Sequence, residues 1–349
     1  MNGVHPINTD SRYIIWLLDF LARKGVDIES LSRIHQLTDL ERLDISISGA
    51  THRALLSDAL QLTGESGLGL KLGYQRSLAT YDQLAYLIMS CATLREATEK
   101  GLKYQNYPGR FSGNAIITTF SEIDGQGCYQ VSVKEDLEEL RLLAVEDLLS
   151  NIMTTARWVL GQPLPVTQLR CDYPEPPHVE DYRAIFNCPM QFDTPVIQLF
   201  FDAAILDQPL PNASPQSARL YASVCEEKSI ARQGGNVAWR LWQLIVKDPA
   251  NPPDMTDAAQ ALCCSTRTLH RKLQSEGWQY QQLIDQIREI HASRVLSDPT
   301  LSVTQVALQL GYSDHSGFLK AFKKWTGLTP TDFRTKLWGP QQPIGLGRS

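Results

Sequence analysis

The sequence has few cysteines, and none of them stands in a pairing pattern. Seven cysteines among 349 residues are an odd number, and no two of them form a Cys-x-x-Cys motif. This spacing argues against both a disulfide framework and a zinc site, and we expect neither a metal nor a cofactor. We interpret the cysteines as reduced thiols, mostly buried; they are Cys91, Cys128, Cys171, Cys188, Cys225, Cys263 and Cys264.

Long apolar runs are also missing. The run from Tyr13 to Leu18 ends at Asp19, well short of the ~20 residues that span a bilayer. The residues that follow Met1 show no basic segment with an apolar segment and a cleavage site behind it. These features predict a protein without a membrane span, located in the cytoplasm.

The charge is unevenly distributed along the chain. The formal net charge of −5 argues against a polyanionic partner when the chain is taken as a whole. From Gly234 onward, however, 13 Lys and Arg face 9 Asp and Glu, a net charge of +4, while the preceding part has 20 against 29, a net charge of −9. The last third is therefore the part suited to a polyanion.

The first two thirds have the pattern of an α+β domain, with helices and a small antiparallel sheet. Helical periodicity predicts helices over Tyr13–Lys24, Gly49–Leu62 and Leu94–Tyr107. Two β-rich runs on either side of Asp124–Gly127 predict a hairpin, because glycine permits the turn geometry. The other expected elements are strands at Ala115–Phe120, Cys128–Val133, Val166–Cys171 and Val196–Phe201, and helices at Leu140–Leu160 and Val179–Phe186.

Turn-forming residues divide the chain into domains. Residues 207–215 are rich in proline, and residues 216–232 have a helical pattern that ends at Gly234 and Gly235. We therefore expect an N-terminal domain over residues 1–210, a linker helix over 211–235, an all-α domain over 236–339 and a flexible tail over 340–349.

The last third contains an internal repeat. Residues 256–277 and 302–327 each show a short helix, a turn, a second helix and a closing glycine. A small residue in the first helix, Ala259 or Ala307, permits two helices to cross closely. An apolar pair four residues apart anchors the second helix to the core; the pairs are Leu269 with Leu273 and Phe318 with Phe322.

The repeat predicts two helix-turn-helix units whose second helices turn a polar face outward. Ser265 and Ser313 stand where they can cap these helices. A helix of this width fits the DNA major groove, where Arg bonds the guanine edge bidentately and Lys or His donates to base acceptors. The candidate DNA-contacting residues are Ser265, Arg267, Thr268, His270, Arg271, His315, Ser316, Lys320, Lys323 and Lys324.

A long amphipathic helix joins the two units. Its apolar residues recur at helical spacing from Tyr280 to Leu296, and Ser297-Asp298-Pro299 ends it. A length of about 25 Å, from ~1.5 Å per residue, could hold the two recognition helices roughly one turn of duplex apart, or ~34 Å. Both helices could then enter successive major grooves on one face of the DNA.

These residues resemble the DNA-binding domain of the AraC/XylS family of bacterial transcription regulators. The resemblance covers about residues 237–336 and rests on four motifs: Ser265–Leu273, Ala307-x-x-Leu-Gly-Tyr312, Phe318-x-x-x-Phe-Lys323 and Gly327–Arg334. It implies binding to double-stranded DNA through two recognition helices, with dimerisation or ligand control through the other domain. Gly317 and Lys320 depart from the family pattern, so we expect Arg267 to Arg271 to set most of the specificity and Lys320 to Lys324 to hold phosphates.

The N-terminal part resembles the arabinose-binding-type domain of a subset of these regulators, including ornithine- and virulence-related ones. The motifs are Leu68–Gly73, Tyr81–Ala92, Phe192-Asp-Thr-Pro195 and Leu206–Leu210. The resemblance implies a domain that binds an effector or dimerises.

The leading hypothesis is a sequence-specific transcription regulator, not an enzyme, controlled by a small-molecule effector in its N-terminal domain. We expect a homodimer, with RNA polymerase as a further partner. One alternative is a ligand-independent regulator whose N-terminal domain only dimerises or contacts RNA polymerase. Another is a DNA-repair alkyl acceptor, which is disfavoured because it needs a reactive cysteine beside histidine and a four-cysteine zinc cluster.

Two other features have competing interpretations. Cys263 and Cys264 precede the first recognition helix. They are either a redox switch or small buried residues, and burial is the commoner role of free cysteine. The acidic run Glu135–Glu139 is either a metal site or a solvent-facing run that favours the dipole of the following helix. We favour the second interpretation in both cases.

Overall fold

The computed structural model describes residues 9–37, 46–81, 83–104, 116–133, 137–233, 237–275, 278–312 and 314–338. These residues form two compact units. The N-terminal unit extends to Ser229 without Asp193–Val196, and the C-terminal unit contains that short segment and the chain from Ile230 onward. The tail expected over residues 340–349 lies outside the described residues. Within the described part of the chain, no helix has the length and apolar character needed to cross a membrane.

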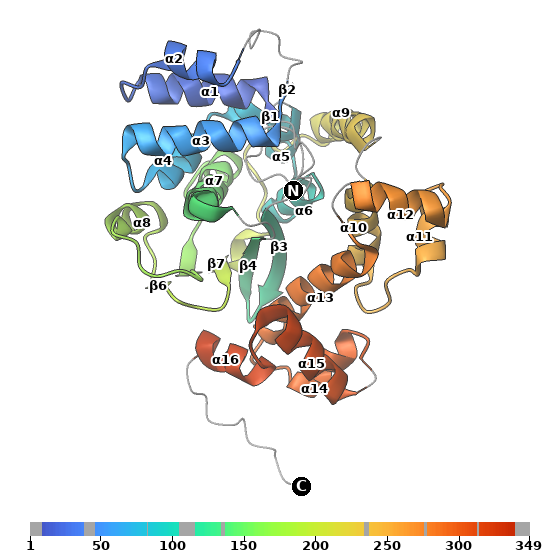
Figure 1. Cartoon of the computed structure of the whole chain (residues 1–349). Helices are drawn as coiled ribbons and strands as arrows, with labels where there is room; N and C mark the ends of the chain where they lie inside the picture. Colours follow the sequence, from blue (N-terminus) through green and yellow to red (C-terminus); the bar gives the residue numbers. More distant parts are fainter. Residues whose placement is uncertain are drawn as a thin grey trace. The chain divides into compact units, whose positions relative to one another are not determined.

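Helices dominate the first hundred residues of the N-terminal unit (Figure 1). Two predicted helices are present as α1 (Ser11–Ala22) and α3 (Gly49–Thr63), and α3 ends at Gly64 in the left-handed conformation. The third, α6 (Leu94–Lys103), is shorter than predicted because Tyr104 is already its C-cap. The sequence pattern does not reveal three helices of seven residues each, which are too short for periodicity to detect: α2 (Ile28–Ile34), α4 (Leu68–Tyr74) and α5 (Gln83–Met89).

A five-stranded sheet follows, in the order β3-β4-β7-β5-β6, and a separate two-stranded pair, β1 (Thr9–Asp10) with β2 (Ser46–Ile47), lies near the start of the chain. The predicted hairpin has a two-residue turn with positive φ at both Asp124 (49°) and Gly125 (75°), the geometry that matches strand twist. The strands are β3 (Ile116–Ile123), β4 (Gln126–Val133), β5 (Val166–Arg170), β6 (Met190–Gln191) and β7 (Ile197–Asp202).

One edge of this sheet contains a parallel pair of strands, whereas we predicted an antiparallel sheet. β7 pairs antiparallel with β4 and β5, but β5 and β6 run parallel. The predicted helix α8 (Val179–Phe186) lies between β5 and β6 in the chain. It provides the crossover connection that a parallel pair requires.

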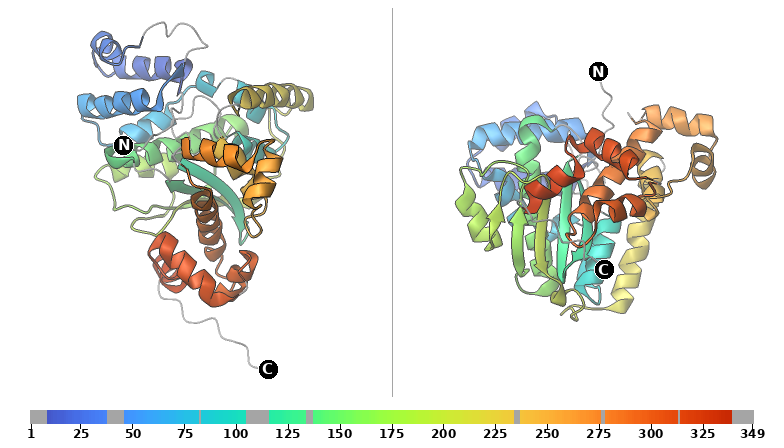
Figure 2. Two further views of the ribbon diagram at one scale, coloured as in Figure 1. Left: turned by 45° about the vertical axis from the view of Figure 1, so that its right-hand side comes forward. Right: turned by 90° about the horizontal axis from the view of Figure 1, so that it is seen from below.

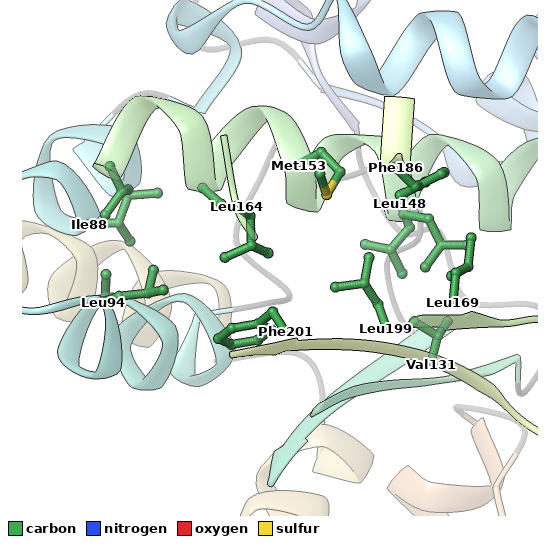
Figure 3. Close-up of a cluster of buried hydrophobic side chains, with 14 of the residues drawn as sticks. Ile88, Leu94, Val131, Leu148, Met153, Leu164, Leu169, Phe186, Leu199 and Phe201 are labelled. Carbon is green, nitrogen blue, oxygen red and sulfur yellow. The ribbon is translucent and has the colours of Figure 1, made fainter. Parts of the chain in front are cut away.

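The main core of the N-terminal unit lies between the sheet and α7 (Arg141–Leu160), the long predicted helix. In Figure 3, Leu148 and Met153 project from α7 toward Leu169 and Leu199 on the sheet. These side chains are at most 8% exposed, and burying each apolar side chain of this size contributes roughly 1.5–3 kcal/mol before entropy is counted. Ahead of α7, Glu138 and Glu139 are exposed, as expected for a solvent-facing acidic run, while residues 134–136 lie outside the described part.

Helix α4 packs unusually close to α7, and glycine makes this possible. A Cβ atom added at Gly69 would lie 2.4 Å from the carbonyl oxygen of Leu143, and one added at Gly73 would lie 2.1 Å from that of Asp147. Two glycines four residues apart lie on the same side of a helix. The Leu68–Gly73 motif is therefore a packing motif that lets two helix backbones approach.

His52 is buried in the second core of this unit, between α1 and α3. His52 is 2% exposed, and its ring packs edge to face with the Tyr13 ring at 5.1 Å between centroids. Burial, and next the positive charges of Arg76 and Arg53, lower the pKa of His52 to about 3. The folded unit therefore holds this histidine neutral.

This burial predicts an acid-dependent loss of stability. The unfolded chain takes up the proton near pH 6.5, whereas the folded unit does so only near pH 3, so stability is lost as the pH falls between these values. The slope for one such group reaches about 1.4 kcal/mol per pH unit. Urea unfolding of the wild type and of His52→Gln from pH 7 to 4.5 should show a weaker pH dependence in the variant. An equal pH dependence of the unfolding free energy in both proteins would contradict the assignment of a buried, neutral His52.

From Val237 onward, the secondary structure in the described part of the C-terminal unit is helical. α13 (Tyr280–Leu296), the predicted connecting helix, leads from one group of three helices to another (Figure 1 and Figure 2, left). The chain reaches this unit through α9 (Pro215–Gln233), within the expected linker region of residues 211–235. Residues 234–236 lie outside the described part. The two groups are α10 (Val237–Lys247), α11 (Met255–Ala261) and α12 (Thr266–Ser275), and α14 (Val303–Gln309), α15 (His315–Thr326) and α16 (Pro330–Trp338).

Candidate nucleic-acid interface

The first helix-turn-helix unit consists of α11 and α12 and has the predicted turn. Ala259 is 2% exposed, and its carbonyl oxygen accepts a hydrogen bond from the amide of Cys264 at 2.9 Å. Cys263 occupies the left-handed region at φ 53°, so the chain reverses without a glycine. Ser265 caps α12 as predicted, because its Oγ accepts from the amide of Thr268 at 3.2 Å.

The exposed face of α12 carries the predicted cations. Leu269 and Leu273 are at most 1% exposed, and at 3.6 residues per turn Arg267 and Arg271 lie on the opposite side. Arg267, His270 and Arg271 are exposed, whereas Thr268 is half-buried and its hydroxyl bonds Ser265 Oγ at 2.9 Å. Gln274 is also exposed on this face, and it follows Arg271 by one turn.

The second unit, α14 and α15, repeats the turn with one extra residue. The amide of Tyr312 donates to the carbonyl oxygen of Ala307 at 3.0 Å, and Gly311 takes the left-handed conformation at φ 75°. The N-cap of α15 is Asp314, whose carboxylate accepts from the amide of Gly317 at 2.7 Å. Ser313, the predicted cap, lies outside the described residues, and Asp314 has the capping role.

The polar face of α15 is exposed as well. Phe318 and Phe322 are completely buried and point away from it. Lys324 is 75% exposed and forms an ion pair with Asp285 of α13 at 3.3 Å, so one of the predicted cations also links α15 to the connecting helix. The exposed candidates on this helix are His315, Ser316, Lys320, Lys323 and Lys324.

Steric crowding does not require a glycine at position 317. A Cβ atom added there would meet Tyr312 Cδ1 at 3.5 Å, an ordinary van der Waals distance. The departure from the family pattern therefore removes a side chain from the exposed start of α15 where one would fit. That α15 reads bases less than α12 does stays a prediction.

The two cysteines beside the first recognition helix are not buried. Cys263 is exposed and Cys264 is half-buried, so the prediction that both fill the core is wrong. The reason is the turn itself, which places Cys263 in the left-handed position at its outer bend. Among the other cysteines, Cys91, Cys128, Cys171 and Cys225 are buried and Cys188 is half-buried.

Comparison with known families agrees with this geometry. A helix-turn-helix domain model matches residues 258–336, and the arabinose-binding domain of AraC transcription regulators matches residues 25–210. The chain belongs to the AraC family of DNA-binding transcription regulators. Members of this family are regulators and not enzymes.

Individual relatives are also transcription regulators. The ornithine utilization regulator of Pseudomonas aeruginosa is 30% identical over 322 residues, which are 91% of this chain and 94% of that protein. The transcriptional regulator VqsM of the same species is 29% identical over 195 residues, 53% of this chain and 59% of that protein. The crystal structure of the transcriptional regulator CdpR, also from P. aeruginosa, has a TM-score of 0.42 and 25% identity, and covers 81% of this chain and 90% of that chain.

Proposed function

We propose that the chain recognises an operator by placing α12 and α15 in successive major grooves, with α12 as the main reader of sequence. The observation that carries this proposal is the duplicated frame within one unit. Each second helix is anchored by a buried apolar pair and turns a cationic face outward. Arg267 and Arg271 are the candidates for bidentate contacts to guanine, and Lys320 and Lys323 for contacts to phosphates.

Arg271 gives the sharpest test of base readout. Arg271→Ala should weaken binding to the cognate duplex by about 1–3 kcal/mol and relax the sequence preference at one position. Arg271→Lys keeps the positive charge but cannot form the planar two-pronged contact, so it should restore little of the lost specificity. The specificity is measured by binding both protein variants to a duplex selected from a random-sequence pool and to duplexes that differ from it by one base pair. Full recovery by lysine would show that Arg271 contacts only phosphate.

The N-terminal domain, residues 1–210, is the proposed site of effector binding and dimerisation. The match of its residues 25–210 to the arabinose-binding domain of AraC regulators supports this role. Because one relative is an ornithine utilization regulator, amino acids related to ornithine are the first effectors to test. A ligand that binds the folded domain at a hundred times its Kd stabilises it by about 2.7 kcal/mol, which a thermal shift detects.

Two results would favour the ligand-independent alternative. The first is that no candidate metabolite stabilises the protein, and the second is that no component of a cell extract alters its binding to DNA. Together they would support an N-terminal domain that only dimerises or contacts RNA polymerase. A fragment from residue 234 onward should bind the selected duplex more weakly than the full chain if the N-terminal domain dimerises. Equal affinity at all protein concentrations would oppose dimerisation.

A further inference from the structure

The middle of α13 holds an arginine that contacts the first helix-turn-helix group through backbone carbonyls. Arg288 Nε donates to the carbonyl oxygen of Pro249 at 3.2 Å, and Arg288 Nη2 donates to that of Ala250 at 3.1 Å. Pro249 and Ala250 lie between α10 and α11. The guanidinium therefore binds the segment that leads into the first unit with two hydrogen bonds.

The same guanidinium also contacts the turn of the second unit. Its Cζ lies 5.7 Å from the centre of the Tyr312 ring, within cation–π range. The neighbouring Gly311 brings its backbone against the same carbonyl, because a Cβ atom added there would lie 2.4 Å from Ala250 O. Arg288 is thus at the point where the segment before α11, the connecting helix and the turn before α15 meet.

We propose that Arg288 is a positioning residue that sets the distance and angle between the two recognition helices, and so the base-pair spacing that the protein accepts. This inference rests on the proposed function, in which both helices enter DNA. A planar guanidinium with donors in a fixed fork suits two adjacent carbonyls and an aromatic ring at once. Lysine has one ammonium group and cannot make the same set of contacts.

A second arginine provides a matched control. Arg334 of α16 donates from Nε to the carbonyl oxygen of Leu296 and from Nη2 to that of Asp298, both at 3.0 Å. These bonds tie α16 to the end of α13 and do not reach the first group. Arg334 therefore resembles Arg288 in chemistry and in its half-buried position but does not join the two groups.

The test varies the DNA between the two contact segments. Full-length wild type first selects a duplex from a random-sequence pool, and footprinting locates the two segments that each bound protomer protects. Duplexes with one or two base pairs inserted or deleted between the segments are then measured by fluorescence anisotropy against wild type, Arg288→Lys and Arg334→Lys. Each base pair moves one segment by about 3.4 Å, so a rigid protein loses the contacts of one helix.

We expect wild type to lose at least about fivefold in affinity when the spacing changes by one base pair, as for a mismatched contact. Arg288→Lys should bind the selected duplex more weakly but vary less than about threefold across spacings. Arg334→Lys should keep the wild-type profile, even if its Tm falls. Far-UV circular dichroism checks folding, and Arg288→Gln takes the place of Arg288→Lys if the latter is unfolded.

The outcomes separate this inference from the function on which it rests. A spacing-sensitive wild type with an equally sensitive Arg288 variant would overturn the inference alone. So would an Arg334→Lys variant as tolerant as the Arg288 variant, because tolerance would then follow from general loosening. A wild type that accepts every spacing would overturn both the inference and the two-helix mode of binding.

Discussion

Replacing Phe322 by alanine is expected to destabilise the C-terminal unit by about 3–5 kcal/mol, the usual range for deleting a buried phenyl ring. Phe322 is completely buried. Its ring lies 5.6 Å from that of Phe318 and 5.4 Å, edge to face, from that of Phe333. The cavity would remove the ring that packs α15 against Phe333 of α16. DNA binding by this helix should therefore fail together with its stability.

Hydrogen exchange read by mass spectrometry measures this effect segment by segment, so the two units do not have to unfold together. Peptides from α13 to α16 should lose protection in Phe322→Ala, while those from α3 and α7 keep it. Leu308→Ala is the control, because Leu308 is on α14 in the same unit and is 61% exposed. Its expected change is within about 0.5 kcal/mol. Similar losses in both variants would refute the assigned core.

Replacing Gly73 by alanine should destabilise the N-terminal unit by about 3 kcal/mol or more, at the upper end of overpacking effects. The added methyl group would stand 2.1 Å from both Asp147 O and Ser150 Oγ and 2.8 Å from the amide of Asn151. Two of these three atoms belong to the α7 backbone and cannot rotate away. The helices would have to separate, and this would disturb the core beneath α7.

Gly101→Ala is the matched control for this substitution. Gly101 lies within α6, and no atom stands within 4 Å of the position that its Cβ would take. Alanine there should stabilise the unit by roughly 0.5–1 kcal/mol, since helical glycine is entropically costly. Opposite signs for the two substitutions in urea unfolding are the expected result. A neutral Gly73→Ala would show that α4 and α7 do not pack this closely.

The repeat shows how far sequence reasoning reaches into the interface. Equivalent residues of the two repeats are 48 positions apart in the chain before the turn, as for Ala259 and Ala307. After the turn they are 49 positions apart, as for Leu269 and Phe318. Applying 48 to the cap selects Ser313, whereas 49 selects Asp314, the residue that caps α15. The sequence therefore identifies the correct cap when the two repeats are aligned on their apolar pairs. It does not do so when they are aligned on the residues before the turn.

Other features had no signal in a single sequence. The apolar anchors and the exposed cations follow from periodicity, which is why α12, α13 and α15 were predictable. The contacts of Arg288 depend on carbonyls that are 38 and 39 residues away in the chain, and local pattern does not report such pairs. The parallel pairing of β5 and β6 is likewise a long-range result, because β6 has only two residues and carries no periodicity.

Hydroxyl-radical footprinting of the full chain on its selected duplex tests the central claim most directly. Two recognition helices held on one connecting helix predict two protected segments for each bound protomer, on one face of the DNA and about 10–10.5 base pairs apart. Arg271→Ala should weaken protection at one segment, and Lys320→Ala with Lys323→Ala at the other. A single protected segment that all three substitutions weaken together would contradict the account.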